Sequence, residues 1–369
     1  MGAQRAVSPP VGYGQELRNR GGGTSYRCYQ CGTCTSVCQL ASRDLTFPRR
    51  QMALTQWGMV DALSSDPCVW LCHQCNDCTE RCPRDARPGD IMQTARSLVV
   101  EHLAVPRFMG RLVAKAGTTW PVLLGVPLVF WIVVLSAVNG GLQPPASFEA
   151  FEDFVPHWLI YAVFFTVTGL VTLSAAVSGL RFWNSLDQAE KRQGGFVEHL
   201  MSVLWEVATH ARFAKCGSER VRRWGHLSLM WGFVGAAVTS GFIIVVMYGL
   251  GEELPLPQTH WVKILGNFSA LLLVVGVVVL VLNRFQEPAP PNLTSAFDGF
   301  FIGLVVLLTI TGVLSEVGRL WFDPTLACYI YIGHLTVVLT LFATFPFSKF
   351  AHLYYRILAL VHERMIQAR

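Results

Sequence analysis

The chain has 369 residues, of which 52% are hydrophobic and only 14% charged, with a formal net charge of +5. Soluble globular proteins are about 25% charged, so this composition excludes a wholly water-soluble protein. The apolar excess is uneven, because residues 1–118 have a soluble character and almost all apolar segments follow Trp120. Length and composition together predict two domains, one soluble and one in a membrane.

The first 25 residues are rich in Gly, Pro and Arg, which predicts a disordered tail over residues 1–25. They contain no apolar stretch of the kind that forms a secretory signal, so we expect the soluble domain to stay in the cytoplasm. Nine of the eleven cysteines lie between Cys28 and Cys82. In a domain that is not exported, thiols at this density favour metal ligation over disulfide bonds.

These cysteines form two runs of the spacing C-x2-C-x2-C-x3-C within residues 26–100. The spacing is typical of bacterial ferredoxins with two [4Fe–4S] clusters, in which three thiolates hold one cluster and the fourth ligates the other. Structural zinc sites more often use pairs of cysteines separated by a longer gap. We therefore predict an interlocked two-cluster domain. The predicted ligands are Cys28, Cys31, Cys34 and Cys82 for the first cluster and Cys72, Cys75, Cys78 and Cys38 for the second.

Three further cysteines, Cys68, Cys216 and Cys328, lie outside this pattern and are predicted to be packing residues. The spacer between the two runs shows no alternation of period two, and its apolar residues suit helical packing. We therefore expect an all-helical cluster domain that resembles a two-cluster ferredoxin.

Residues 101–118 join the two domains and are predicted to form an amphipathic connector. Arg107, Arg111 and Lys115 recur every four residues and therefore share one helix face. A basic stripe beside a membrane suits anionic lipid headgroups. A solvated helix face is the alternative interpretation.

Six apolar segments follow within residues 119–355, each close to the roughly 20 residues that cross a bilayer. They are residues 120–138, 157–180, 224–249, 261–283, 297–318 and 327–350. Positive charge marks the cytoplasmic side of a membrane protein. Lys and Arg are absent from loops 139–156 and 250–260 but frequent in loop 181–223 and in the predicted cytoplasmic tail 356–369. We therefore expect a six-helix bundle in the cytoplasmic membrane, with both termini and the cluster domain in the cytoplasm.

Histidines in the apolar segments are candidate haem ligands, because ionisable groups inside a membrane are costly and usually functional. In the sixth segment His334 and His352 are 18 residues apart, which on one continuous helix is about five turns and about 27 Å. His226 begins the third segment at the depth of His352. Because a low-spin haem takes two axial ligands, we predict one haem b between His226 and His352.

A second haem on His334 would need another partner, and the matching position in the third segment is Ala236. His157 and His260 are the remaining candidates for that partner. Both stand beside tryptophans at the ends of apolar segments, where an aromatic belt is the alternative interpretation.

Loop 181–223 contains a predicted amphipathic helix that lies on the membrane surface. Its polar side carries His199, Glu206 and His210. These side chains are predicted either to be solvated or to accept protons near a quinone headgroup.

Three pieces of the sequence carry a resemblance to a known family: WLCHQCNDCTERCPRDARPGDIM, HARFAKCGSERVRRWGH and PFSKFAHLYYR. Over residues 26–362 the chain resembles the C-type membrane component of the quinone-interacting membrane-bound oxidoreductase complex. That family joins an iron–sulfur domain like the C component of heterodisulfide reductase to a cytochrome b like its E component. The last piece is also similar to the nitrate reductase gamma cytochrome, which implies His226, His334 and His352 as ligands of haem b.

The resemblance also implies a function. Two flavin- and iron–sulfur-containing subunits would dock on the cluster domain, and electrons would pass between menaquinone and adenylylsulfate reductase in dissimilatory sulfur metabolism. We expect a relay of single electrons among quinone, haem b, the two clusters and a soluble flavin, with no nucleic-acid partner. The alternatives are a heterodisulfide-reductase-type membrane subunit and a haem-free anchor and assembly scaffold.

Overall fold

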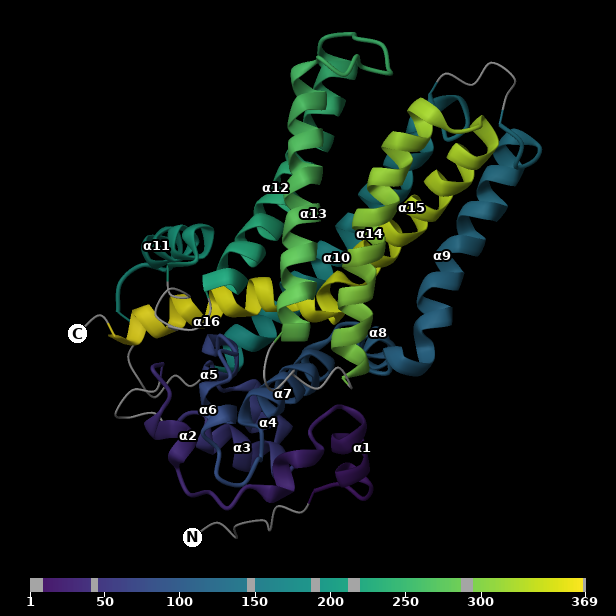
Figure 1. The fold of residues 1–369 in the computed structure, drawn as a ribbon. Helices are drawn as coiled ribbons and strands as arrows, with labels where there is room; N and C mark the ends of the chain where they lie inside the picture. The colour runs from purple at the N-terminus through teal and green to yellow at the C-terminus, as the bar shows by residue number, and fades with distance from the viewer. Residues whose placement is uncertain are drawn as a thin grey trace.

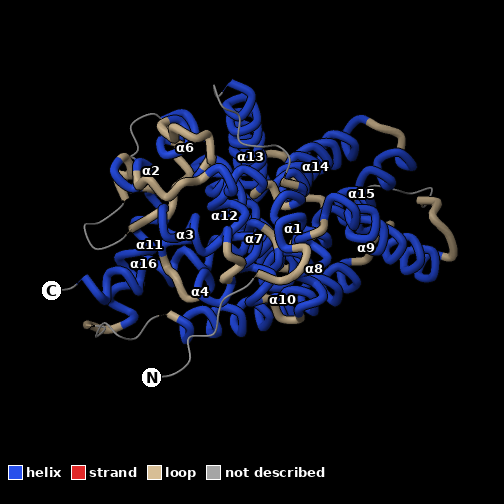
Figure 2. Tube along the Cα trace, turned by 90° about the horizontal axis from the view of Figure 1, so that it is seen from below, coloured by secondary structure: helices blue, strands red, loops and turns tan. Residues whose placement is uncertain are grey.

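A computed structural model describes residues 9–40, 46–144, 150–186, 193–211, 220–286 and 295–367. Within these ranges the chain consists of helices and connecting loops, without a strand (Figure 2). Short helices of the amino-terminal part gather at one end of the molecule, and long helices rise away from them (Figure 1). The predicted all-helical class is therefore confirmed for the described residues.

The amino-terminal part packs several short helices around one longer helix, α7 (Pro88–Leu103). The short ones are α1 (Tyr13–Asn19), η1 (Gly23–Arg27), α2 (Thr33–Ser36), α3 (Arg49–Gln56), α4 (Val60–Ser64), α5 (Cys68–Leu71) and α6 (Asp77–Glu80). Helix α7 begins at Pro88. Proline is well tolerated in the first helical turn, where an amide N–H would have no partner within the helix. Ile91, Ala95 and Val99 of α7 are completely buried at helical spacing, so this helix forms the core of the domain.

Residues 9–25, which were predicted to belong to a disordered tail, are folded. Tyr13 and Leu17 of α1 are buried, and the Tyr13 hydroxyl donates a hydrogen bond of 2.6 Å to the carbonyl oxygen of Thr55. Composition alone predicted disorder here. It cannot show the anchor between Tyr13 and Thr55, which are 42 residues apart in the chain. Residues 1–8 lie outside the described part.

Six helices are long and apolar enough to cross a membrane, as predicted. They are α9 (Ala116–Asn139), α10 (His157–Ser185), α12 (Arg220–Gly249), α13 (Trp261–Gln286), α14 (Ala296–Trp321) and α15 (Pro324–Thr344). Helix α12 packs along α13, and α14 packs along α15. The connections include α8 (Arg107–Ala114), η2 (Phe151–Asp153) and α11 (Phe196–Thr209). The basic side chains of the predicted connector, Arg107 and Arg111 in α8 and Lys115 directly after it, are exposed.

The sixth apolar segment is not one continuous helix, which corrects the prediction for residues 327–350. Helix α15 ends at Thr344 and is followed by two 3-10 helices, η4 (Phe345–Phe347) and η5 (Lys349–Ala351). Pro346 lies within this break, and proline has no N–H to continue the helical hydrogen bonds. The chain then turns into α16 (His352–Gln367), which crosses below the long helices (Figure 1). The predicted five-turn separation of His334 and His352 on one helix is therefore wrong.

Helix α16 also replaces the predicted tail from residue 356 onward. Its Tyr355 is completely buried and stacks on Trp70 of the amino-terminal part, with ring centroids 4.7 Å apart. Phe182 of α10 meets the edge of the same tyrosine at 5.3 Å. These rings belong to a single hydrophobic core. The cluster domain and the membrane helices are thus held together through α16.

Candidate functional site

The structure brings together the four cysteines predicted to hold the first cluster. The thiol of Cys34 is buried, and its pKa is raised to about 11 by burial first and then by the neighbouring sulfur atoms of Cys28, Cys31 and Cys82. Cys82 comes from the second run. The interlocking inferred from the spacing is therefore compatible with the fold.

The second predicted set is assembled in the same way. Burial raises the pKa of the Cys78 thiol, and the sulfur atoms of Cys72, Cys75 and Cys38 raise it further. Cys34 of the first set also acts on Cys78, so the two groups of thiols are neighbours. This proximity suits transfer of an electron between two clusters.

The backbone around these cysteines suits an iron–sulfur cluster. Backbone N–H groups of Gln30, Gln74 and Ala86 donate to the sulfur atoms of the cysteines that precede them, at 3.3–3.5 Å. Hydrogen bonds to the sulfurs are one of the features that set the potential of a cluster. Among the described residues, no three His, Cys, Asp or Glu side chains are grouped closely enough to hold a single metal ion.

The rings of His226 and His352 lie close together and nearly perpendicular to each other where α12 meets α16. Their ring centroids are 6.3 Å apart, with an interplanar angle of 77°. Metal–imidazole bonds of about 2 Å, with ring radii of about 1.1 Å, place two axial imidazoles about 6.3 Å apart across one metal. This separation leaves room for one haem iron, which His226 and His352 would hold through their Nε2 atoms.

Hydrogen bonds at the Nδ1 atoms of both rings leave their Nε2 atoms available to bind a metal. His210 lies with Nδ1 2.7 Å from the carbonyl oxygen of Val207 and Nε2 2.8 Å from Nδ1 of His226. If His210 donates to the carbonyl, its Nε2 accepts from His226 Nδ1–H, and the Nε2 of His226 is left with a lone pair. His352 Nδ1 donates to the Lys349 carbonyl oxygen at 2.5 Å, with the same consequence. Burial lowers the pKa of His352 to about 4, which favours the neutral, ligating form.

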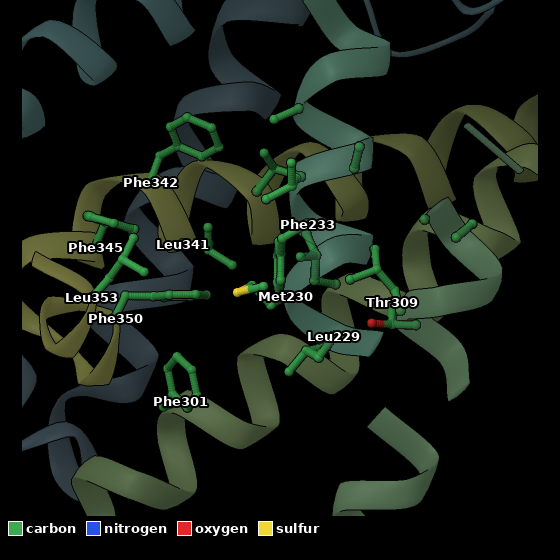
Figure 3. A pocket seen from close by; sticks show the side chains of 18 of the residues that line it. Leu229, Met230, Phe233, Phe301, Thr309, Leu341, Phe342, Phe345, Phe350 and Leu353 are labelled. Atoms are coloured by element: carbon green, nitrogen blue, oxygen red, sulfur yellow. The ribbon is translucent and has the colours of Figure 1, made fainter. Parts of the chain in front are cut away.

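A cavity of about 1300 Å³ extends from this histidine pair through the helix bundle. Figure 3 shows its apolar wall, to which Met230, Phe233, Phe301, Phe342 and Phe350 contribute from four different elements. Binding sites for large, flat cofactors are mostly apolar, with a few polar groups that fix orientation. The residues present therefore fit haem b, with the imidazoles as the polar anchors.

The other predicted site residues are divided between the cavity and the surface. His334, His157, Glu206 and Ala236 line the cavity, whereas His199 and His260 do not. His334 lies next to Thr311, His157 pairs with Glu152, and His260 pairs with Glu252. His199 lies 3.1 Å from the carbonyl oxygen of Gln193, and Glu206 pairs with Arg364. Neither His157 nor His260 is in ring contact with His334 among the described contacts.

Sequence reasoning missed three arginines that join the second cysteine run to the histidine pair. Arg222 donates to the carbonyl oxygen of Gln74 at 2.6 Å. Arg356 donates to the Cys72 carbonyl oxygen at 3.4 Å and to the ring of His73 at 2.9 Å. Arg96 of α7 donates to the Cys72 carbonyl oxygen of the same loop and to the Val69 carbonyl oxygen of α5. We name these three side chains the arginine clamp.

The arginine clamp had a signal in the sequence. Arg222 precedes His226 by four residues, and Arg356 follows His352 by four residues. Residues four apart share a helix face, so His226 and His352 each stand one turn from an arginine. The loop that the clamp binds begins at Cys72, a predicted cluster ligand. The clamp thus fixes the second cluster site beside the histidine pair.

The unassigned cysteines agree with a packing role where they are described. Cys68 and Cys328 are both buried in hydrophobic clusters. Burial raises the pKa of the Cys68 thiol, which keeps it protonated and unreactive. Cys216 lies outside the described residues.

Comparison with known proteins agrees with both halves of this arrangement. Residues 24–86 match the model of a 4Fe-4S dicluster domain, and residues 109–369 match the family model "Citrate utilization protein B". The chain is 27% identical to citrate utilization protein B of Escherichia coli, over 90% of this chain and 88% of that protein. No solved structure matches the chain.

Two further relatives each resemble one half. The C component of H(2):CoB-CoM heterodisulfide,ferredoxin reductase from Methanothermobacter thermautotrophicus is 32% identical over 38% of this chain and 77% of its own length. The E component of dihydromethanophenazine:CoB--CoM heterodisulfide reductase from Methanosarcina thermophila is 28% identical over 35% of this chain and 53% of its own length. The expected likeness to these two components of heterodisulfide reductase is thus confirmed. The chain is an electron-transfer iron–sulfur subunit of a membrane-associated reductase, and it belongs to the citrate utilization protein B family.

Proposed function

We propose that this chain relays electrons between a quinone in the membrane and a soluble flavoprotein, through one haem b and two [4Fe–4S] clusters. The observation that carries the proposal is the His226–His352 pair, whose ring centroids are 6.3 Å apart and which lines a large apolar cavity. The arginine clamp ties that pair to the loop of Cys72. The proposed cluster ligands are the two interlocked sets of four cysteines.

Within this relay the residues of the chain bind and orient. When bound, haem and clusters supply the one-electron chemistry that organic side chains lack. His226 and His352 would hold the haem, and His210 keeps His226 in the ligating tautomer. The clamp holds the cluster loop against the same site. Phe233 and Phe350, whose ring centroids are 5.6 Å apart, belong to the apolar wall that excludes water.

We further propose that the cluster domain and both termini face the cytoplasm. The distribution of Lys and Arg supports this orientation, because Arg222 of the basic loop and Arg356 of the basic C-terminal segment both contact the cluster domain. In the cytoplasm the cluster thiolates would remain reduced.

The partners follow from two different similarities. Resemblance to the C-type component of the quinone-interacting complex supports menaquinone, two flavin-containing subunits and adenylylsulfate reductase as redox partners. A soluble partner enzyme of citrate utilization is the second candidate, and it is favoured by a relative that matches 90% of this chain. Reoxidation of the dithionite-reduced protein by each purified partner distinguishes the two.

A reduced-minus-oxidised visible spectrum of the purified protein tests the relay itself. We expect the sharp α band of low-spin haem b, with about eight acid-labile sulfides per chain. The same sample is analysed for zinc. Absence of the α band would refute the haem assignment and leave the anchor-and-scaffold alternative, and stoichiometric zinc would refute the clusters.

A further inference from the structure

The cavity continues beyond the histidine pair toward the end of the bundle far from the cluster domain. This distal half is lined by Ala236 of α12, His334 of α15, and Glu152 and His157 near the start of α10. The far end is identified by Asn139, the last residue of α9, which donates a hydrogen bond of 2.8 Å to Phe154. The proposed relay leaves the polar groups of His334, Glu152 and His157 without a role.

His334 is held in a defined tautomer. The hydroxyl of Thr311 donates to the Leu307 carbonyl oxygen at 2.7 Å, so its oxygen accepts from Nδ1–H of His334, 3.0 Å away. The Nε2 of His334 is then a hydrogen-bond acceptor. Gly312 lies against the ring, where an added Cβ would be 3.2 Å from Cε1. The ring is therefore fixed by close packing on α14.

Two kinds of ligand could use this nitrogen. A second haem needs an axial ligand on its other face, but α12 lines the same cavity with Ala236. A quinol needs only an acceptor for its O–H group and apolar walls for its ring and tail. The distal half offers both, because Ile243, Val338 and Val313 line it together with His334.

A second polar pair stands at the distal end. Nδ1 of His157 lies 3.1 Å from a carboxylate oxygen of Glu152, and the imidazole stacks on Tyr161 with ring centroids 6.1 Å apart. Both members of the pair line the cavity and remain partly exposed. The pair can therefore exchange a proton between the cavity and the distal surface of the protein.

We propose that the distal half of the cavity binds the ring of the quinone, with His334 Nε2 as acceptor for the quinol hydroxyl and the His157–Glu152 pair as the proton outlet. This proposal rests on the proposed electron relay, because it places the membrane substrate of that relay. With the quinone ring in the distal half, the hydrogen bonds of His199, Glu206 and His210 have structural roles. These residues belong to the proximal end of the molecule, on the side of the His226–His352 pair.

The test measures binding of heptyl-hydroxyquinoline N-oxide, a fluorescent quinol analogue, to the full-length protein in detergent, together with haem per chain. His334→Leu is expected to weaken binding about tenfold or more through loss of one buried hydrogen bond, and His334→Gln, which keeps an acceptor, weakens it less. Thr311→Val is expected to weaken binding by an intermediate factor. Thr336→Val is the matched control and is expected to leave binding unchanged, since the Thr336 hydroxyl bonds to the Ile332 carbonyl within its own helix and Thr336 does not line the cavity. Cluster absorbance in every variant verifies folding.

Three results would overturn the proposal. Haem content that falls from two per chain to one in His334→Leu would make His334 an axial ligand of a second haem. Binding that is lost in Glu206→Gln and kept in His334→Leu would place the quinone ring at the proximal end. Binding unchanged in both His334→Leu and Thr311→Val would remove His334 from the site. A wild-type protein without haem would refute the relay alone, because inhibitor binding is measured independently of haem.

Discussion

Arg356→Met is the sharpest test of the arginine clamp. The substitution keeps an unbranched apolar stem and removes the guanidinium, which donates to the carbonyl oxygen of Cys72 and to the ring of His73. A hydrogen bond to a charged group contributes about 1.5–3 kcal/mol. If this contact breaks whenever the Cys72 loop opens locally, the variant lacks its stabilisation of the closed loop. The equilibrium constant for opening is then about 10–150-fold larger than in wild type, because about 1.4 kcal/mol corresponds to a factor of ten.

The assay follows loss of cluster absorbance after addition of an iron chelator to the purified protein. We expect Arg356→Met to bleach about 10–150-fold faster than wild type, in a phase that accounts for half of the cluster absorbance. Arg364→Met is the matched control: Arg364 lies two turns further along α16 and pairs with Glu206 of α11 instead of the cluster loop. Equal bleaching rates in the two variants would refute the idea that the clamp secures the second cluster site.

Three further predictions concern the haem site and the joint between the two parts. His352→Ala removes one proposed axial ligand, so the low-spin α band is expected to disappear and electron transfer from quinol to the clusters to stop; an unchanged spectrum contradicts the assignment. Lys349→Met leaves the buried carboxylate of Asp298 without the ammonium that lies 3.1 Å away, at a cost of about 3–5 kcal/mol, and replacing both residues by apolar ones is expected to restore the melting temperature. Tyr355→Ala removes the ring stacked on Trp70 and is expected to cost about 3–5 kcal/mol in thermal denaturation; an unaltered melting temperature would show that α16 does not join the two parts.

The sequence by itself determined the class of the protein. Nine cysteines in 55 residues, with two runs of identical spacing, predict a two-cluster domain because the ligands of each cubane are close in the chain. Six apolar segments predict six long helices because crossing a bilayer depends on local composition. Both inferences use short-range information, and both agree with the fold and the family matches.

Only the tertiary structure decided how the redox sites meet. Pro346 ends the sixth long helix early and lets α16 turn across the bundle, so that His352 reaches His226 while His334 stays further up the cavity. The periodicity that placed His334 and His352 on one face assumed an unbroken helix. The contact of Arg356 with His73 joins residues 283 positions apart, and no local pattern encodes such a contact. Contacts of this kind depend on how helices pack. The ligand types and the pairing of His226 with His352 could therefore be predicted from the sequence, whereas the break at Pro346 and the arginine clamp could not.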